Sequence, residues 1–210
     1  MDNLRKVYLI RHSKTRGNIE KRYIGATDQE LAQEGIRELV AKKSRYPDVE
    51  LVFASPMKRS VQTAQLIYAA KEARLMDGLR ECDFGAFENK TYEDLKDDSL
   101  YRAWIDSGCS GDIPQGENAD AFRRRCGGAF EDILEEMKAE NAETAAIVAH
   151  GGTFMSILEK YTPESLAEGR RFYEWRMENC EMMELIIKDN RIIEIRRAEK
   201  DAPIGVVPVR

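Results

Sequence analysis

Two histidines stand where apolar stretches of the sequence end, and they are the residues best suited to chemistry. His12 comes directly after Arg11 at the end of the apolar run 7–10, and His150 follows the run 144–149. The chain has no other histidine. A buried strand that ends in a cation and an imidazole presents both at the edge of a sheet, where open α/β folds bind ligands. The two strand ends therefore point to one shared site.

A further cation and a pair of glycines suggest what this site binds. Arg59 lies in the first turn of a helix that Ser55 and Pro56 are expected to open, because serine caps helices and proline suits their first turn. A helix N-terminus attracts anions, and the guanidinium fork fits phosphate oxygens. Gly151 and Gly152 let the backbone approach a ligand closely. These features predict a phosphoryl pocket without a glycine-rich phosphate loop or a metal-ligand cluster.

An imidazole at the floor of a phosphoryl pocket suggests nucleophilic catalysis. A neutral nitrogen of His12 could attack phosphorus and form phosphohistidine. Arg11, Arg59 and a protonated His150 would then neutralise charge on the transferring oxygens. The basic leaving group of a phosphomonoester needs a proton donor, for which Glu81 is the candidate among several nearby acids. Taken singly, each of these residues also has a structural interpretation, as a core histidine, a solvated arginine or a surface acid.

The elements that must position these residues alternate between strands and helices. We expect strands at 7–10, 50–54, 74–76 and 144–149, helices at 31–46, from 56 past 67, at 117–140 and at 152–161, and a C-terminal β-hairpin formed by 182–188 and 191–196. Between the third strand and the long helix, an insertion of loops and short helices at about 82–116 should lie over the site. The alternation predicts an α/β fold, a three-layer sandwich with a mainly parallel central sheet flanked by helices. Residues 202–210 are expected to form a loosely attached tail.

Composition limits the class of protein. The chain has 210 residues, 42% of them hydrophobic and 34% charged, which suits a single domain over 1–210. Its net charge of −5 gives no reason to expect nucleic acid or membrane partners. Four scattered cysteines are typical of reduced thiols in a cytoplasmic protein. The expected partner is a small phosphorylated metabolite, and the chain could be a monomer or a homodimer.

Several motifs, spread from the first strand to His150, combine into one pattern. They are Arg11-His12 with Thr15 and Asn18; Gly25, Asp28 and Leu31; Ser55-Pro56-x-x-Arg59-x-x-Gln62-Thr63-Ala64; Leu79-x-Glu81-x-x-x-Gly85; Gly116-Glu117 with Arg125; and His150-Gly151-Gly152. This pattern resembles that of the histidine phosphatase superfamily, also called the phosphoglycerate mutase-like family. The sequence departs from it at Ser13, where the family has glycine.

The resemblance implies a role for each matched residue. It makes His12 the phospho-accepting nucleophile and Glu81 the proton donor, which then serves as the base for water. It assigns the phosphoryl group to Arg11, His12, Asn18, Arg59, His150 and Gly151. It implies no metal or organic cofactor for hydrolysis.

The same resemblance leaves two activities and one inactive alternative open. The run 83–89 resembles the Asp-Phe-Gly-x-Trp-Glu-Gly pattern of the small phosphatases, so we favour a phosphomonoester hydrolase, one similar to the α-ribazole phosphatases. The alternatives are a cofactor-dependent phosphoglycerate mutase and a catalytically weak binding member of the family. Aromatic residues of the insertion either contact the leaving group or simply pack the insertion. The expected substrate pocket consists of Thr15, Ile24, Phe84, Phe87, Tyr101 and Trp104.

Overall fold

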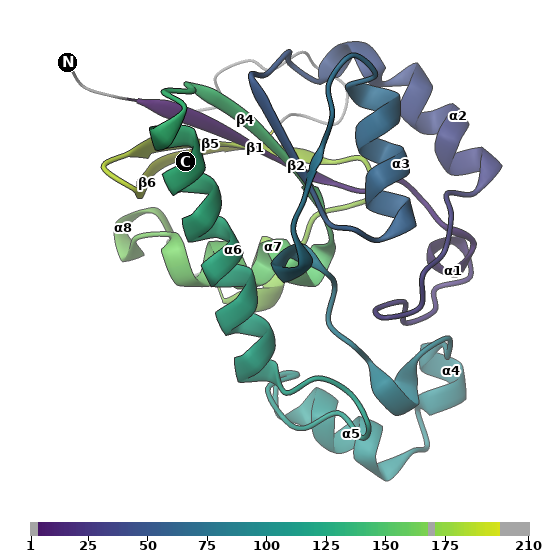
Figure 1. The fold of residues 1–210 in the computed structure, drawn as a ribbon. Helices are drawn as coiled ribbons and strands as arrows, with labels where there is room; N and C mark the ends of the chain where they lie inside the picture. Colours follow the sequence, from purple (N-terminus) through teal and green to yellow (C-terminus); the bar gives the residue numbers. More distant parts are fainter. Residues whose placement is uncertain (1–3, 168–170, 198–210) are drawn as a thin grey trace.

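A six-stranded mixed sheet forms the centre of the molecule (Figure 1). The computed structural model describes residues 4–167 and 171–197. The strand order is β3-β2-β4-β1-β5-β6. The strands are β1 (Arg5–Arg11), β2 (Leu51–Ala54), β3 (Arg74–Leu75), β4 (Thr144–Ala149), β5 (Met182–Lys188) and β6 (Arg191–Arg197). The pairs β1/β4, β2/β4 and β2/β3 are parallel, whereas the hairpin β5/β6 joins β1 in antiparallel orientation, so the predicted fold class is confirmed.

Helices cover both faces of this sheet. α2 (Gln33–Ala41) and α3 (Lys58–Ile67) lie on one face, and α6 (Ala119–Ala139) and α7 (Gly151–Tyr161) on the other (Figure 1). Along β1, Val7 and Leu9 join the core under α6 and α7, while Tyr8 and Ile10 join the core under α2 and α3. Successive strand residues point to opposite faces, so a run that is apolar throughout suits a strand buried on both sides.

The long helix α6 agrees with the predicted helix 117–140 to within two residues at each end. Asn118 caps it, because its side chain accepts from the backbone N–H groups of Asp120 and Ala121. Its apolar stripe is buried throughout: Phe122, Cys126, Ala129, Ile133 and Met137. This stripe holds α6 on the sheet and fixes the insertion that precedes it.

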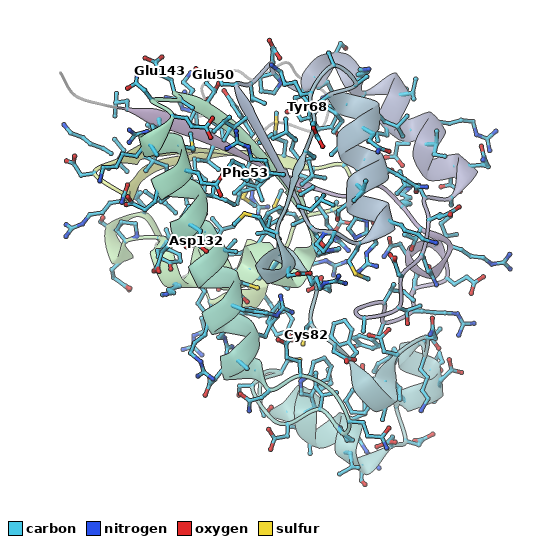
Figure 2. All side chains as sticks on the ribbon, in the orientation of Figure 1. Glu50, Phe53, Tyr68, Cys82, Asp132 and Glu143 are labelled. Atoms are coloured by element: carbon cyan, nitrogen blue, oxygen red, sulfur yellow. The ribbon has the colours of Figure 1, made fainter. Side chains whose placement is uncertain are left out.

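The predicted insertion is made of short helices, as expected. It contains η3 (Gly85–Phe87), α4 (Tyr92–Leu95) and α5 (Ser99–Asp106), and η2 (Asp77–Leu79) precedes it. In Figure 1, α4 and α5 lie beyond the sheet, beside the N-terminal end of α6. Cys82, labelled in Figure 2, lies between the sheet and these two helices.

Two local predictions at helix starts are wrong. α3 begins at Lys58 after Met57, so Ser55 does not cap it, and the Ser55 side chain is used elsewhere. α2 covers only Gln33–Ala41 because its N-cap is Ala32, which has no side-chain acceptor, and the turn η1 (Lys43–Arg45) follows it. The remaining elements are α1 (Arg16–Ile19), α8 (Glu164–Ala167) and η4 (Phe172–Trp175). The predicted tail 202–210 lies outside the described residues.

The cysteines and helices add two observations. Cys82, Cys109, Cys126 and Cys180 are all free thiols. Among the described residues, no helix has both the length and the apolar character needed to cross a lipid bilayer.

Candidate active site

His12 and His150 lie side by side at the ends of two neighbouring strands. β1 and β4 are parallel and in register, with Arg11 opposite Ala149, so the next residue of each chain segment emerges at the same edge. The two imidazole centroids are 5.1 Å apart and the rings meet edge to face. Both side chains are buried. The predicted pairing of the two histidines is therefore present in the structure.

The hydrogen bond at Nδ1 of His12 fixes which ring nitrogen can react. Nδ1 lies 2.7 Å from the carbonyl oxygen of Ser13. A carbonyl can only accept, so Nδ1 carries the proton and Nε2 keeps a free lone pair. Burial, followed by the charges of Arg59 and Arg11, lowers the pKa of His12 well below 6.5. His12 is thus a neutral imidazole with an available nitrogen at neutral pH.

His150 is neutral as well, which corrects the prediction of a protonated ring. Nε of Arg59 donates to Nδ1 of His150 at 3.2 Å, and Nε2 lies 2.8 Å from Oγ of Ser55. Because the guanidinium can only donate, the proton of the ring is on Nε2 and is donated to Ser55. Burial and then the charge of Arg59 lower the pKa of His150 well below 6.5.

Arg59 reaches the site from the first turn of α3 and is fully buried. Its Nη1 donates to the carbonyl of Thr27 and its Nη2 to the carbonyl of Gly25, both at 2.9 Å. With the bond to His150, these contacts use three of the five N–H donors of the guanidinium. The loop 25–27 is held in place by these bonds, and two donors remain for an anion.

Arg11 supplies the second cation from the end of β1. Its Nη1 donates to the carbonyl of Met177, and its buried Nε has no partner among the described residues. A Cβ on Gly151 would lie 3.5 Å from the guanidinium carbon, so Arg11 passes directly over this glycine. The arginine, the glycine backbone and the two imidazoles thus converge on one point.

Glu81 lies at the same point, held by backbone donors. Its Oε2 accepts from the N–H of Gly152 at 3.0 Å and its Oε1 from the N–H of Cys82 at 3.1 Å. A Cβ on Gly152 would overlap Oε1 of Glu81. The second glycine after His150 therefore allows the carboxyl group to approach the site.

A cavity of about 990 Å³ opens beside these residues. Arg11, Asn18, Glu81, Gly151 and Gly152 line one part of it. His12, Arg59 and His150 are buried and are not among the residues that line it. The cavity is lined by more cations than acids, although the chain carries a net charge of −5; the cations are Arg11, Lys14, Lys21, Arg22, Arg123 and Arg176, and the acids Glu34, Glu81 and Glu178.

Only half of the expected substrate pocket lines this cavity. Ile24, Phe84 and Trp104 do, together with Tyr23 and Phe122, which the sequence did not single out. Phe87 and Tyr101 are fully buried among the aromatic residues of the insertion, where they serve as core. These two therefore pack the insertion, which was the structural alternative for the aromatic residues.

Thr15 and Asn18 are hydrogen-bonded to each other at the start of α1. Thr15 caps α1, and Oδ1 of Asn18 accepts from its backbone N–H at 3.0 Å, which completes a capping box. Thr15 is buried and does not line the cavity, whereas Asn18 does. The capping box thus orients Asn18, which lines the same cavity as Arg11.

Ser13 is accommodated without backbone strain. It is not among the described non-glycine residues with positive φ. Its hydroxyl donates to the carbonyl of Gly35 at 2.8 Å and accepts from Sγ of Cys180 at 3.1 Å, and its N–H donates to Oγ1 of Thr63 at 3.0 Å. The Ser13 hydroxyl, which a glycine would lack, therefore ties the first loop to α2 and to Cys180 just before β5.

Sequence reasoning missed two backbone contacts that support Arg11 and His12. Asn179 donates from Nδ2 to the carbonyl of His12 at 2.9 Å, and the N–H of Cys180 donates to the carbonyl of Arg11 at 3.1 Å. Both belong to the segment before β5, which has no motif in the sequence. Ser55, the partner of His150, was recognised but assigned to a helix cap.

Comparison with known proteins agrees with this geometry. The family model described as "Histidine phosphatase superfamily (branch 1)" matches residues 7–199. The "Putative phosphoserine phosphatase 2" of Hydrogenobacter thermophilus is 26% identical over 161 residues, covering 74% of this chain and 77% of the relative. The "Probable phosphoglycerate mutase GpmB" of Yersinia pestis is 29% identical over 183 residues, covering 84% of this chain and 82% of the relative.

A solved structure shares the fold. It is described as "a putative alpha-ribazole-5'-P phosphatase" from Escherichia coli, and it matches with a TM-score of 0.79 at 23% identity, covering 97% of this chain and 99% of that chain. The family match extends over most of the sequence, and the two histidines stand together at the edge of the sheet. The chain belongs to the histidine phosphatase superfamily, branch 1.

Proposed function

We propose that this protein hydrolyses phosphomonoesters through a phosphohistidine intermediate at His12. The observation that carries the proposal is the bond from Nδ1 of His12 to the Ser13 carbonyl, which leaves Nε2 as a neutral nucleophile. After burial, the nearby charges of Arg59 and Arg11 also lower the pKa of this histidine. A neutral nucleophile close to two cations suits attack on a phosphate dianion.

Two steps complete the reaction. In the first, Nε2 of His12 forms a bond to phosphorus while the ester P–O bond breaks, and Glu81 gives its proton to the departing oxygen. In the second, water attacks phosphorus, Glu81 takes a proton from this water, and the N–P bond breaks to release inorganic phosphate. Arg11 and Arg59 stabilise the negative charge on the transferring oxygens in both steps, while neutral His150 holds Arg59 in place through Nδ1.

The cavity favours a bulky, aromatic leaving group. Tyr23, Phe84 and Trp104 form a cluster of edge-to-face rings whose centroids lie 5.2 to 6.1 Å apart, and all three line the cavity. A volume of about 990 Å³ is at the upper end for small-molecule sites and exceeds what a three-carbon phosphate needs. A nucleoside-like phosphate suits it, as the name of the similar Escherichia coli structure also suggests. Four free thiols suit a reducing compartment, so we expect the reaction to take place in the cytoplasm.

Phosphoglycerate mutase activity is the second candidate because a relative at 29% identity carries that name. A mutase transfers the phosphoryl group of the same phosphohistidine to a hydroxyl of phosphoglycerate instead of water. The two activities therefore share His12 and differ in which acceptor reaches it.

The decisive experiment measures hydrolysis of an aryl phosphate in EDTA by wild type and by His12→Ala. The proposal predicts turnover by wild type and at least about a 10³-fold loss in the variant. Acid-labile, base-stable phosphate should be trapped on His12. Equal rates for the two proteins, or label on another residue, would contradict the proposal.

A second assay separates the alternatives. With 3-phosphoglycerate and 2,3-bisphosphoglycerate, a phosphatase releases phosphate and forms little 2-phosphoglycerate. Efficient isomerisation with negligible hydrolysis would establish the mutase instead, and a protein that binds phosphate esters without either reaction would be the weak binding member of the family. A panel of nucleotides, α-ribazole phosphate and sugar phosphates then identifies the preferred leaving group.

A further inference from the structure

The segment 78–81, which carries Glu81, is held by side chains of two other elements. Thr153 of α7 donates from Oγ1 to the carbonyl of Arg80 at 3.1 Å and to that of Leu79 at 3.3 Å. Arg125 of α6 donates to the carbonyls of Gly78, Arg80 and Glu81 at 3.0, 2.7 and 2.9 Å. Backbone carbonyls that have no partner in regular structure need other donors, and here these donors come from α6 and α7.

Every N–H donor of Arg125 has an oxygen acceptor. Nη1 donates to Gly78 and Arg80, and Nη2 to Glu81. The other two donors go to the carboxylate of Glu117, with Nε to Oε1 and Nη2 to Oε2 both at 2.7 Å. A guanidinium has five donors in one plane, so this side chain is fully used and its orientation is fixed.

Glu117 is itself attached to the loop that follows Glu81. Its N–H donates to the carbonyl of Asp83 at 2.9 Å. A Cβ on Gly116 would lie 2.6 Å from the same carbonyl, so this glycine is what lets the two backbones touch. A Cβ on Gly78 would likewise lie 2.7 Å from Cβ of Ala129, so glycine allows the segment to lie directly against α6.

We propose that Arg125 and Glu117 are positioning residues that hold Glu81 where it can protonate the leaving group. Neither residue lines the cavity, and their hydrogen bonds go to each other and to the backbone of residues 78–83. Their side chains are 27% and 19% exposed, which shields the bidentate pair from solvent. The inference rests on the proposed function, because it assumes that Glu81 is the proton donor, and it assigns a role to two residues outside the phosphoryl site.

The test compares leaving groups, since only the proton donor is sensitive to them. Arg125→Lys keeps the charge but loses the planar fork, because one ammonium group has three donors and cannot reach five acceptors in one plane. The rate constant kcat/KM is measured for an activated aryl phosphate, whose leaving group needs little protonation, and for an alkyl phosphate, which needs it fully. We expect Arg125→Lys and Glu117→Gln to lower kcat/KM for the alkyl phosphate at least about tenfold more than kcat/KM for the aryl phosphate. Glu81→Gln should change the two values in the same direction.

A double-mutant cycle identifies the path of the effect. If Arg125 acts through Glu81, the double variant Glu81→Gln/Arg125→Lys should hydrolyse the alkyl phosphate as fast as the single variant Glu81→Gln. Arg74→Lys is the matched control, because Arg74 also pairs with carboxylates, those of Glu136 in α6 and of Glu140 at its C-cap, and does not line the cavity. It should leave the ratio of the two rates unchanged.

Three results contradict the proposal in distinguishable ways. Equal slowing of both esters by Arg125→Lys, or losses that multiply in the double variant, would make the pair merely structural. Glu117→Gln gives the same comparison if Arg125→Lys does not fold. A wild type without hydrolysis, or a Glu81→Gln variant that slows both esters equally, would instead overturn the proposed function or the role of Glu81.

Discussion

Nε of Arg59 lies 3.2 Å from Nδ1 of His150, which makes this imidazole an acceptor and therefore neutral. The same guanidinium reaches the carbonyls of Gly25 and Thr27, so one side chain connects α3, the loop 25–27 and the end of β4. Arg59 thus organises the site and also supplies its charge.

Arg59→Lys should therefore lower activity strongly, although the variant keeps the positive charge. A lysine cannot bond His150 and both carbonyls in one plane, so the phosphoryl group loses a fixed donor. We expect kcat to fall by about 10²- to 10³-fold, the usual effect of removing one preorganised donor. Steady-state kinetics with an aryl phosphate measures it, and Arg37→Lys on the exposed side of α2 is the control. A loss no larger than that of the control would show that Arg59 is not needed in this geometry.

The two neutral histidines predict how stability depends on pH. Burial and nearby arginines lower the pKa of both below the value of 6.5 expected in the unfolded chain. Below pH 6.5 the unfolded chain therefore binds more protons than the folded protein, and the free energy of unfolding falls as pH falls. Between pH 7.5 and 5.5 each histidine should account for a loss of up to about 1.4 kcal/mol, the limit reached when the folded histidine takes up no proton in this range.

Urea unfolding at these two pH values measures this loss. His12→Asn removes one of the two titrating groups, so its free energy of unfolding should decrease by about half as much over the same interval. A variant with the full pH dependence of wild type would contradict the assignment of a lowered pKa to His12.

Gly152→Ala tests the approach of Glu81 to the second glycine after His150. The added methyl group would overlap Oε1 of Glu81 and must displace the carboxyl group. Hydrolysis of alkyl phosphates should slow by about 10- to 100-fold, and that of activated aryl phosphates less, because only the former depend on the proton donor. Gly128→Ala on α6 is the control, since a Cβ there meets no atom of the described residues within 4 Å. Unchanged alkyl phosphate kinetics would show that the carboxyl group does not need this position.

Ser13→Ala separates stability from catalysis at the first loop. The hydroxyl of Ser13 donates to the buried carbonyl of Gly35, and its loss should reduce the free energy of unfolding by about 1–2 kcal/mol. The carbonyl that orients His12 belongs to the backbone and remains, so kcat should change by less than about threefold. Ser60→Ala is the matched control, because the buried Ser60 hydroxyl has no partner among the described residues. A large loss of kcat with unchanged stability would reverse this assignment.

The strands and their polar ends could be predicted from the sequence because both signals are local. An apolar run followed by Arg11-His12, and another followed by His150, already places two imidazoles at the edge of a sheet. The parallel register of β1 and β4 then brings them to 5.1 Å. The motif around Arg59 was informative for the same reason.

Other parts of the site depend on contacts that no local pattern reveals. The role of Ser55 was misread because a serine before a proline fits a helix cap, whereas the tertiary fold gives its hydroxyl to His150 instead. Asn179 supports His12 from far along the sequence. Phe87 and Tyr101 are aromatic residues of the insertion, as are Phe84 and Trp104. Only the packing of the insertion decides that the first two are core residues and the other two line the cavity.

The central position of β1 has a consequence during synthesis. This strand is synthesised before both of its neighbours, β4 and β5, which begin at residues 144 and 182. Arg11 is bonded to Met177 and His12 to Asn179, and these pairs are separated by 166 and 167 positions in the sequence. The nascent chain must therefore hold an apolar strand with both edges unpaired until residues beyond 182 have been translated, which exposes it to aggregation. A product truncated before residue 177 would carry His12 without the contacts from Met177 and Asn179 that support this loop.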